Sequence, residues 1–390
     1  MTKNNFDILI KGDNMSRQLS KLTSICLALL ILVLVGGCSD DDCPTCPKDE
    51  AVKPYKGFLY YVELNPQLYD VYVVEMETDS IVDSIDVPDE PTGFLDVSSD
   101  GQYLAVTSSP LEDIGVHCYL YDAQTREFIR ELPDRMVPFF DVTHNLVVGN
   151  VPFENDAYGG VRILSYPSFS LVYEDTTLSG FGTDLIDAPH HKIYGRSDSR
   201  IHSYDYINRT FTSHPIIDQI YGHECTIKQF CLNPAGTKIY FKAGVGGSPE
   251  YEMIGAFDLA ASQLLWYKII RGPWGGIAVS PDDREIYADE VGSSHGINPG
   301  VLFVIDSQTG VQLQAFSLAG HSSTNPHFLI AAESFIYSPT GEKLYIGGGS
   351  LARGGGMLAT FDPIEREWIK FITPDFNRGV GHRMVIGPKR

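Results

Sequence analysis

The sequence predicts an all-β protein, a seven-bladed β-propeller closed by its C-terminal strand and preceded by a lipoprotein signal and a short tether. Three observations lead to this prediction. A strand–turn–strand phrase recurs along the chain, the C-terminus carries one strand more than the repeats need, and an apolar N-terminal segment ends at a cysteine.

The repeated phrase consists of apolar residues, a turn of the Ser-Pro-Asp-Gly kind, and an alternating strand that ends in Tyr or Val. Its copies are Phe94–Val106, Gln229–Phe241, Ile277–Ala288 and Phe335–Gly347, with weaker ones at Phe139–Gly149 and Leu185–Gly195. The turns are marked by Gly101, Asn145, His191, Gly236, Asp283 and Gly341, which are 44 to 58 residues apart. A repeat of this length that reads as four short strands is typical of a propeller blade. Hairpin turns of this kind require a positive φ.

Counting the repeats gives six blades with their own first strand and a seventh with three strands, which begins at Gly57. The missing innermost strand is predicted within His382–Pro388, with Arg383–Gly387 pairing beside Gly57–Leu64. This closure joins the two ends of the chain and leaves no open sheet edge at the seam. The propeller domain is therefore expected over residues 56–390.

The Ser-Pro-Asp-Gly turns followed by Leu-Tyr-Val-like strands resemble the YVTN or YncE-like β-propeller family. This family belongs to a larger group with quinoprotein amine dehydrogenase β-chains and lactonase-type propellers. The resemblance covers about Tyr55 to Arg390 and rests on structural motifs. It implies the propeller fold but transfers no activity, because one fold hosts many functions.

The N-terminal segment is predicted to be a signal peptide. Leu22–Gly37 is uncharged, follows several basic residues, and is shorter than the about 20 residues of a membrane-spanning helix. The sequence Val35-Gly36-Gly37-Cys38 resembles the lipobox of bacterial lipoproteins, which implies removal of residues 1–37 and acylation of Cys38. Two or three acyl chains on one residue would anchor the protein stably in a membrane.

Residues 38–55 are expected to form a tether. The acidic run Ser39–Asp42 resembles the surface-export signal of Bacteroidetes lipoproteins, and a solvated acidic spacer is the alternative interpretation. The predicted location is therefore the cell envelope, in the outer membrane, with surface exposure as one outcome. Cys43 and Cys46 form a CxxC pair, for which a small disulfide is favoured over a redox pair or half of a metal site.

The charge of the chain excludes one class of partner. The sequence has a net charge of −21, and removing residues 1–37 takes away four basic and two acidic residues, which leaves −23. Such a surface repels phosphate backbones, so nucleic-acid binding is disfavoured. The scattered cysteines Cys118, Cys225 and Cys231 form no evident disulfide framework and are expected to pack as small apolar residues.

The candidate binding site is placed on the face where each first strand begins, because the loops predicted on that face are long. Three of these entries carry a Gly-His pair, and their rings are expected to converge at the mouth of the central channel. Imidazoles are common metal ligands, and Glu224 could complete a metal site. The alternative is that the rings only hydrogen-bond the backbone of channel-lining turns. The predicted ligand-binding residues are His223, His321, His327, His382, Arg353 and Trp274.

Two classes of function follow. The favoured one is a non-catalytic binding module for a protein or small molecule, displayed on the envelope through the lipid anchor on Cys38. The alternative is a lactonase-like hydrolase or a dehydrogenase subunit with a metal or ligand at the channel mouth. No catalytic residue, cofactor, metal or ligand is specified by the sequence. The opposite face, with its short turns, is expected to offer little to a ligand.

Overall fold

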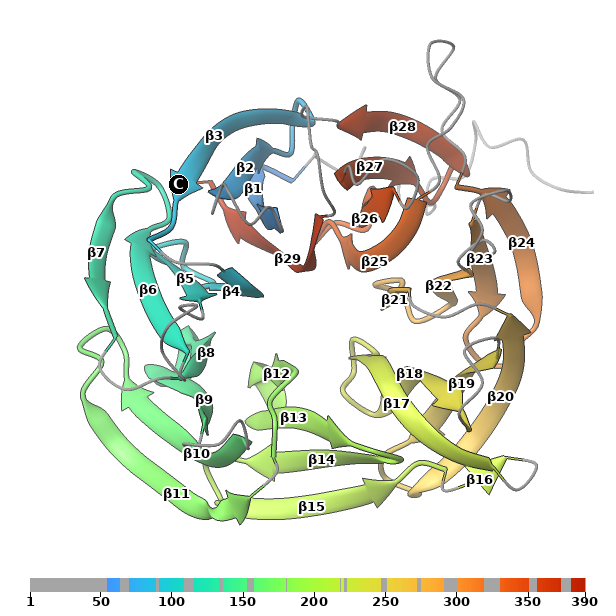
Figure 1. Cartoon of the computed structure of the whole chain (residues 1–390), viewed down its shortest axis with the longest axis horizontal. Helices are drawn as coiled ribbons and strands as arrows, with labels where there is room; N and C mark the ends of the chain where they lie inside the picture. Colours follow the sequence, from blue (N-terminus) through green and yellow to red (C-terminus); the bar gives the residue numbers. More distant parts are fainter. Residues whose placement is uncertain are drawn as a thin grey trace, which may run out of the picture. The chain divides into compact units, whose positions relative to one another are not determined.

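The computed structural model describes residues 55–63, 70–88, 91–108, 116–132, 136–152, 158–179, 181–217, 219–220, 223–246, 251–271, 275–290, 300–318, 330–350, 356–372 and 380–389. All of them belong to one unit, Lys53–Arg390. They form seven antiparallel sheets arranged as blades in a ring (Figure 1). The predicted all-β, seven-bladed propeller is confirmed. The predicted signal, residues 1–37, and the predicted tether, residues 38–55, lie outside the described residues apart from Tyr55.

Blades 1 to 4 each contain four strands, which follow one another from the innermost to the outermost. Blade 1 is β29 (Val380–Pro388), β1 (Gly57–Glu63), β2 (Asp70–Glu75) and β3 (Ser80–Asp86). Blade 2 is β4 (Pro91–Val97), β5 (Tyr103–Ser108), β6 (His117–Asp122) and β7 (Phe128–Glu131). Blade 3 is β8 (Val137–Asp141), β9 (Leu146–Pro152), β10 (Tyr158–Ser165) and β11 (Leu171–Ser179). Blade 4 is β12 (Leu185–Asp187), β13 (Lys192–Ser197), β14 (Arg200–Asp205) and β15 (Thr210–Pro215).

Blades 5 to 7 follow the same order. Blade 5 is β17 (His223–Leu232), β18 (Lys238–Val245), β19 (Tyr251–Asp258) and β20 (Gln263–Arg271), with the short β16 (Gln219–Ile220) paired to the start of β17. Blade 6 is β21 (Ile277–Val279), β22 (Glu285–Glu290), β23 (Val301–Asp306) and β24 (Gln312–Ser317). Blade 7 is β25 (Ile330–Tyr337), β26 (Leu344–Ser350), β27 (Gly356–Asp362) and β28 (Glu367–Ile372). Two 3-10 turns, η1 (Val142–His144) and η2 (Ala188–His190), connect the first and second strands of blades 3 and 4.

The ring is closed by the two ends of the propeller chain. The C-terminal strand β29 pairs antiparallel with β1, with Val385 opposite Tyr60 and Met384 opposite Tyr61. In the ring, β29 lies between the innermost strands of blades 7 and 2 (Figure 1). The closure predicted from the sequence, and the count of seven blades that depends on it, are both confirmed.

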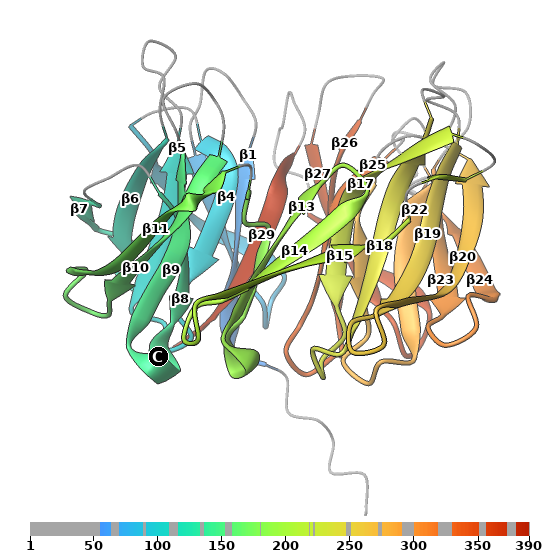
Figure 2. The same ribbon diagram turned by 90° about the horizontal axis from the view of Figure 1, so that it is seen from below.

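The propeller has two rims. At the mouth rim the innermost strand of each blade begins, and at the turn rim a short turn joins that strand to the second one. Figure 2 shows the turn rim at the bottom, where β29 ends at the C-terminal label. The six residues predicted to mark the turns all have left-handed backbones, with φ between 55° and 76°. This agreement confirms the hairpin positions on which the repeat was built.

The core lies between the blades. The second strand of each blade is covered on both faces, and Tyr60, Tyr240 and Tyr345, which hold the same position in three blades, are fully buried. By contrast, the outermost strand β24 is mostly exposed. Of the scattered cysteines, Cys118 and Cys225 are buried without a disulfide, as predicted, and Cys231 is partly buried. Over the described ranges, which start at residue 55, no helix has the length and apolarity of a membrane span.

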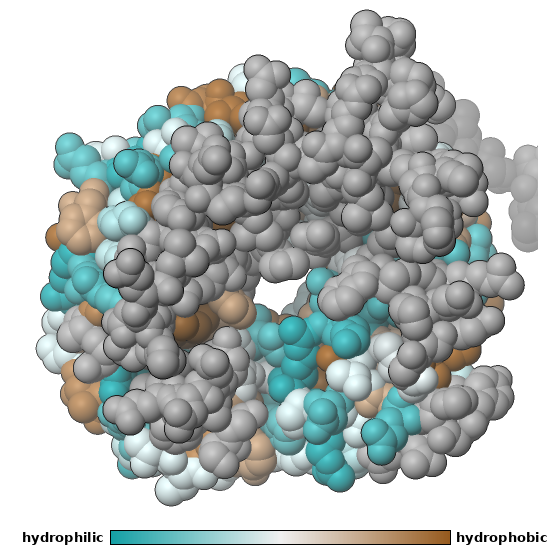
Figure 3. All heavy atoms as spheres, viewed as in Figure 1, coloured by the Kyte–Doolittle hydropathy of each residue, from teal (hydrophilic) through white to brown (hydrophobic). Residues whose placement is uncertain are grey.

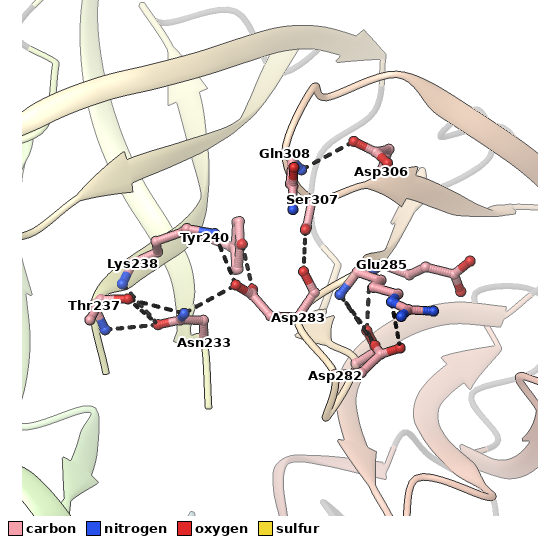
Figure 4. Close-up of polar contacts among 12 residues, drawn as sticks. Asn233, Thr237, Lys238, Tyr240, Asp282, Asp283, Glu285, Asp306, Ser307 and Gln308 are labelled. Atoms are coloured by element: carbon pink, nitrogen blue, oxygen red, sulfur yellow. Dashed lines mark hydrogen bonds and ion pairs between the residues drawn. The ribbon is translucent and has the colours of Figure 1, made fainter. Parts of the chain in front are cut away.

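At the turn rim, side chains of one blade donate hydrogen bonds to a carboxylate of the next blade, and Figure 4 shows this between blades 5 and 6. The carboxylate of Asp283 in blade 6 accepts hydrogen bonds from Tyr240 Oη at 2.6 Å, Lys238 Nζ at 2.9 Å and Asn233 Nδ2 at 3.2 Å, all from blade 5. The seam uses the same donors with an acceptor from a different turn. Asp79, between β2 and β3 of blade 1, accepts from Lys343 Nζ at 2.8 Å and Tyr345 Oη at 2.9 Å of blade 7. In blades 5 and 7, a Lys-apolar-Tyr sequence at the start of the second strand therefore bonds to a carboxylate of the next blade.

Replacing Asp283 with Asn is expected to lower the free energy of unfolding by about 1.5–3 kcal/mol at neutral pH, the range for hydrogen bonds to charged groups. Asn tolerates the left-handed φ of 58°, so the substitution isolates the charge. Burial alone would raise the pKa of Asp283, but the hydrogen bonds from Tyr240, Lys238 and Asn233 outweigh it and lower the pKa below 3.8. The ionised Asp283 carboxylate therefore makes its full contribution to the free energy of unfolding above pH 3.8. That contribution is lost as the pH falls through the lowered pKa.

Denaturant unfolding of both proteins at several pH values measures this effect. The difference between wild type and Asp283→Asn should narrow below about pH 4. Asp282→Asn in the same turn is the control, because the Asp282 side chain is 57% exposed. This substitution should change the free energy of unfolding by less than about 1 kcal/mol. Equal losses from the two variants would contradict the role given to Asp283.

Candidate functional site

Two of the residues predicted to bind a ligand lie in described strands near the mouth rim. His223 is the first residue of β17, and His382 is the third residue of β29, so both belong to innermost strands. Their side chains are outside the described part of the structure, as are His321, His327, Arg353 and Trp274 altogether. The space-filling view shows the opening at the centre of the ring, bordered in part by hydrophilic residues (Figure 3). The convergence of these histidines stays a prediction.

Below the mouth rim, five second strands carry a polar residue at their fifth position. We call these residues the mouth-side polar set: Thr107, Asn150, Arg196, Lys242 and Asp289. All but Arg196 are at most 1% exposed. Burying a polar group is costly unless it is hydrogen-bonded, so each of these side chains needs a specific partner.

The partners are largely the segments that lead into the innermost strands. Asn150 donates from Nδ2 to the carbonyl of Phe181 and accepts from the backbone N–H of Thr183 at 2.8 Å, which fixes the segment that leads into β12. Thr107 Oγ1 donates to the carbonyl of Phe94 in β4 at 3.1 Å. Asn150 and Thr107 therefore fix backbone at the mouth-rim entries of blades 4 and 2.

Between blades 5 and 6, two members of the set form a buried charge cluster with Glu252. Lys242 Nζ lies 3.3 Å from Glu252 Oε2 and 3.3 Å from Asp289 Oδ1, and it donates to the backbone carbonyl of Asp289 at 3.0 Å. The three side chains are between 0% and 7% exposed. Gly275, two residues before β21, packs directly against the Asp289 carboxylate and has no room for a side chain. The cluster thus also supports an entry to the mouth.

The turn rim holds a second group of polar side chains, between blades 3 and 4. Among the described residues, Asp141, His144 and His191 are the group of three whose ligating atoms all lie within 4.8 Å of one another. Asp141 is the N-cap of η1 and its side chain is fully buried, with Oδ2 2.7 Å from His144 Nδ1. The ring of His191 stands at 89° to that of His144, with 4.2 Å between their centroids.

Tyr206 completes this group from blade 4. Its hydroxyl donates to Asp141 Oδ2 at 2.6 Å. Burial, and then the hydrogen bond to Asp141, raise the pKa of Tyr206, so the phenol stays protonated and remains a donor. The Asp141 carboxylate is therefore held in one orientation by groups from two blades.

Sequence reasoning misses this group because it treats the turn rim as a face of short hairpins. A signal is present, since blades 3 and 4 share an Asp-x-x-His turn, Asp141-Val-Thr-His144 and Asp187-Ala-Pro-His190. The repeat marks His191 only as a turn residue. Its approach to Asp141 and His144 depends on how two neighbouring blades pack, which no local pattern states.

Comparison with known proteins identifies the fold. No protein-family model and no curated protein matches the sequence. Among solved structures, a protein of unknown function from Desulfotomaculum acetoxidans matches with a TM-score of 0.58 at 16% identity, over 85% of this chain and 99% of its own. What the matches share with this chain is the β-propeller.

Two further matches carry names of their own. Dihydro-heme d1 dehydrogenase NirN, solved in complex with DHE, gives a TM-score of 0.55 at 14% identity, over 86% of this chain and 76% of its own. Hydrazine synthase from Kuenenia stuttgartiensis gives 0.56 at 12% identity, over 84% and 99%. At these identities the likeness shows the fold alone, because propellers host many unrelated activities.

Proposed function

We propose that this protein is a lipid-anchored protein of the cell envelope whose propeller acts as a non-catalytic binding module, with its site at the mouth rim. The observation that carries the site is the mouth-side polar set. Buried polar residues such as Asn150 and Lys242 are costly, and here Asn150 fixes the segment that leads into β12, while Lys242 joins β18 to Asp289 of β22, against which the entry residue Gly275 packs. A rigid scaffold beneath a set of loops is how binding sites are commonly built.

The anchor is supported by the sequence Val35-Gly36-Gly37-Cys38 at the end of an apolar segment, and the acidic residues behind Cys38 favour the outer membrane with display on the cell surface. The repeats, which resemble YVTN or YncE-like propellers, are compatible with an exported binding protein. An enzyme with a channel-mouth metal is the alternative. It rests on the same predicted histidines.

Replacing Cys38 with Ser is expected to abolish acylation and to leave a soluble or uncleaved protein. The reason is that the thiol carries the acyl chains and no other residue can substitute for it. Labelled palmitate followed by membrane fractionation measures the result, and Cys43→Ser is the matched control that should remain acylated. Equal label in wild type and Cys38→Ser would remove the anchor from the proposal.

The mouth site can be tested in intact cells with a photo-reactive residue at Arg353. We expect a discrete covalent adduct with a partner from this position and none from Glu365, an exposed residue of the same blade at the turn rim. Changing His223, His321 and His382 together to Ala should remove the adduct without changing the melting temperature. Equal adducts from both positions, or none from Arg353, would contradict a binding site at the mouth rim.

A further inference from the structure

We propose that Asp141, His144 and His191 bind one divalent transition-metal ion of the Zn²⁺ class at the turn rim, between blades 3 and 4. This site lies on the rim opposite the proposed mouth site. It does not depend on the function proposed above.

The donor set suits such an ion. Two imidazoles and a carboxylate are ligands that Zn²⁺ and similar first-row ions accept, with water completing an open site. The Asp141 side chain is fully buried, whereas that of His144 is 33% exposed, so the group has one side open to solvent. Two ligands of a tetrahedral Zn²⁺ with bonds of about 2.0–2.1 Å lie about 3.3 Å apart. The present separations are all within 4.8 Å, so a slight closure of the side chains would bring them around the ion.

His191 supplies the independent sign of a missing partner. Its Nδ1 atom is buried and has no hydrogen-bond partner among the described residues. Buried polar atoms without a partner are rare in native structures, and an ion is one of the few groups that satisfy them. In addition, His191 has a left-handed backbone, with φ of 58°, at a turn position that Gly occupies in three other blades. The turn requires only a residue that tolerates a positive φ, so it does not by itself account for an imidazole at this position.

Tyr206 provides the orienting contact expected around a metal ligand. Its hydroxyl donates to Asp141 Oδ2 at 2.6 Å, and the backbone N–H of Tyr206 donates to the carbonyl of His191 at 3.0 Å. Outer partners of this kind fix the direction of a ligating carboxylate. The same residue therefore ties together ligands from both blades.

The neighbouring joint shows what the arrangement looks like without the third ligand. Between blades 4 and 5, His190 Nδ1 lies 2.9 Å from both oxygens of Asp187, as His144 lies against Asp141. The next blade places Gly236 there, and a Cβ on Gly236 would come within 2.5 Å of Asp187 Oδ2 and His190 Nδ1. The Asp-His pair is therefore a turn feature in both blades. Of these two joints, the one between blades 3 and 4 adds a second imidazole.

The test is Zn²⁺ binding to the purified full-length chain, measured by equilibrium dialysis after removal of metal with a chelator. Cys43 and Cys46 are changed to Ser in every protein, because this pair could bind zinc on its own. The variant is His191→Gly, which suits the left-handed backbone and reproduces the next blade. The matched control is His190→Ala, which removes the equivalent turn histidine from blade 4.

We expect one equivalent of Zn²⁺ in the parent protein and in His190→Ala. In His191→Gly the affinity should fall by more than the about 10–100-fold that the loss of an outer partner costs, and Tyr206→Phe should fall within that range. If His191→Gly does not fold, as judged by its circular dichroism and melting curve, His191→Asn, which copies Asn145 of blade 3, takes its place. Zinc bound equally by the parent and the His191 variant, or no zinc bound by the parent at micromolar free concentrations, overturns the site.

Discussion

Deleting Val380–Arg390 is expected to abolish cooperative folding of the propeller. The deletion removes β29, the innermost strand of blade 1, and exposes the inner edge of β1 along its whole length. Leu59, Tyr60 and Tyr61 of β1 are fully buried in the intact protein. An exposed apolar strand edge also pairs readily with other chains, so the truncated protein should aggregate.

The size of the effect follows from what β29 contributes. It buries Met384 and Val385, each worth about 1.5–3 kcal/mol, and a ladder of backbone hydrogen bonds worth about 0.5–1.5 kcal/mol each. Their sum is comparable with the about 5–15 kcal/mol that stabilises a whole domain. Moreover, β29 lies between β25 and β4, so its loss opens the ring and affects three blades at once.

Circular dichroism melting curves and size-exclusion chromatography measure the outcome. The matched control removes only Lys389 and Arg390, which leaves β29 intact and costs little beyond the exposed ion pair between Lys389 Nζ and Glu75 Oε1 at 2.6 Å. A deletion of Val380–Arg390 that melts as sharply and at the same temperature as this control would contradict the closure.

The repeat, the blade count and the seam can be predicted from the sequence because each depends on local patterns. A turn residue such as Gly236 or Asp283 is needed wherever φ must be positive, and alternating strands flank it. Counting identifies the C-terminal strand, since the three strands that begin at Gly57 need a fourth. None of these steps requires knowledge of how one blade touches another.

The burial of the second strands cannot be predicted in the same way. Alternation predicts one buried and one exposed face, but β5 and β18 are sandwiched between blades and are buried at nearly every position. In the sequence, polar residues such as Thr107 and Lys242 therefore resemble solvent-facing strand residues. Their partners come from entry segments or from the next blade, at distances along the chain that no motif encodes.

The same reason explains the turn-rim cluster. Asp141 and His144 are close in sequence, but His191 comes from the next repeat and meets them only because the blades pack side by side. The predicted mouth histidines can be named from the sequence because they lie at or near strand entries, three of them directly after a Gly. Which imidazoles approach one another is decided by blade packing.

Replacing Lys242 with Ala is expected to lower the free energy of unfolding by about 3–5 kcal/mol, the cost of removing one partner from a buried ion pair. Lys242 Nζ lies 3.3 Å from both Glu252 Oε2 and Asp289 Oδ1, and all three side chains are buried. Without the ammonium group, two carboxylates would share a site with little access to water. Lys242→Met, which keeps most of the volume, should recover the packing but not the charge, so it should remain clearly destabilised.

Denaturant titration of the purified variants tests this expectation, with Lys268→Met as the matched control. Lys268 also belongs to blade 5, and its hydrogen bond to Gln312 is exposed to solvent, so its loss should change stability by under about 0.5 kcal/mol. Combining Lys242→Met with Asp289→Asn should cost less than the sum of the single changes, because the second removes a carboxylate that the first left unneutralised. A loss below about 1 kcal/mol for Lys242→Ala, or strict additivity in the double variant, would show that this cluster does not hold blades 5 and 6 together at the mouth.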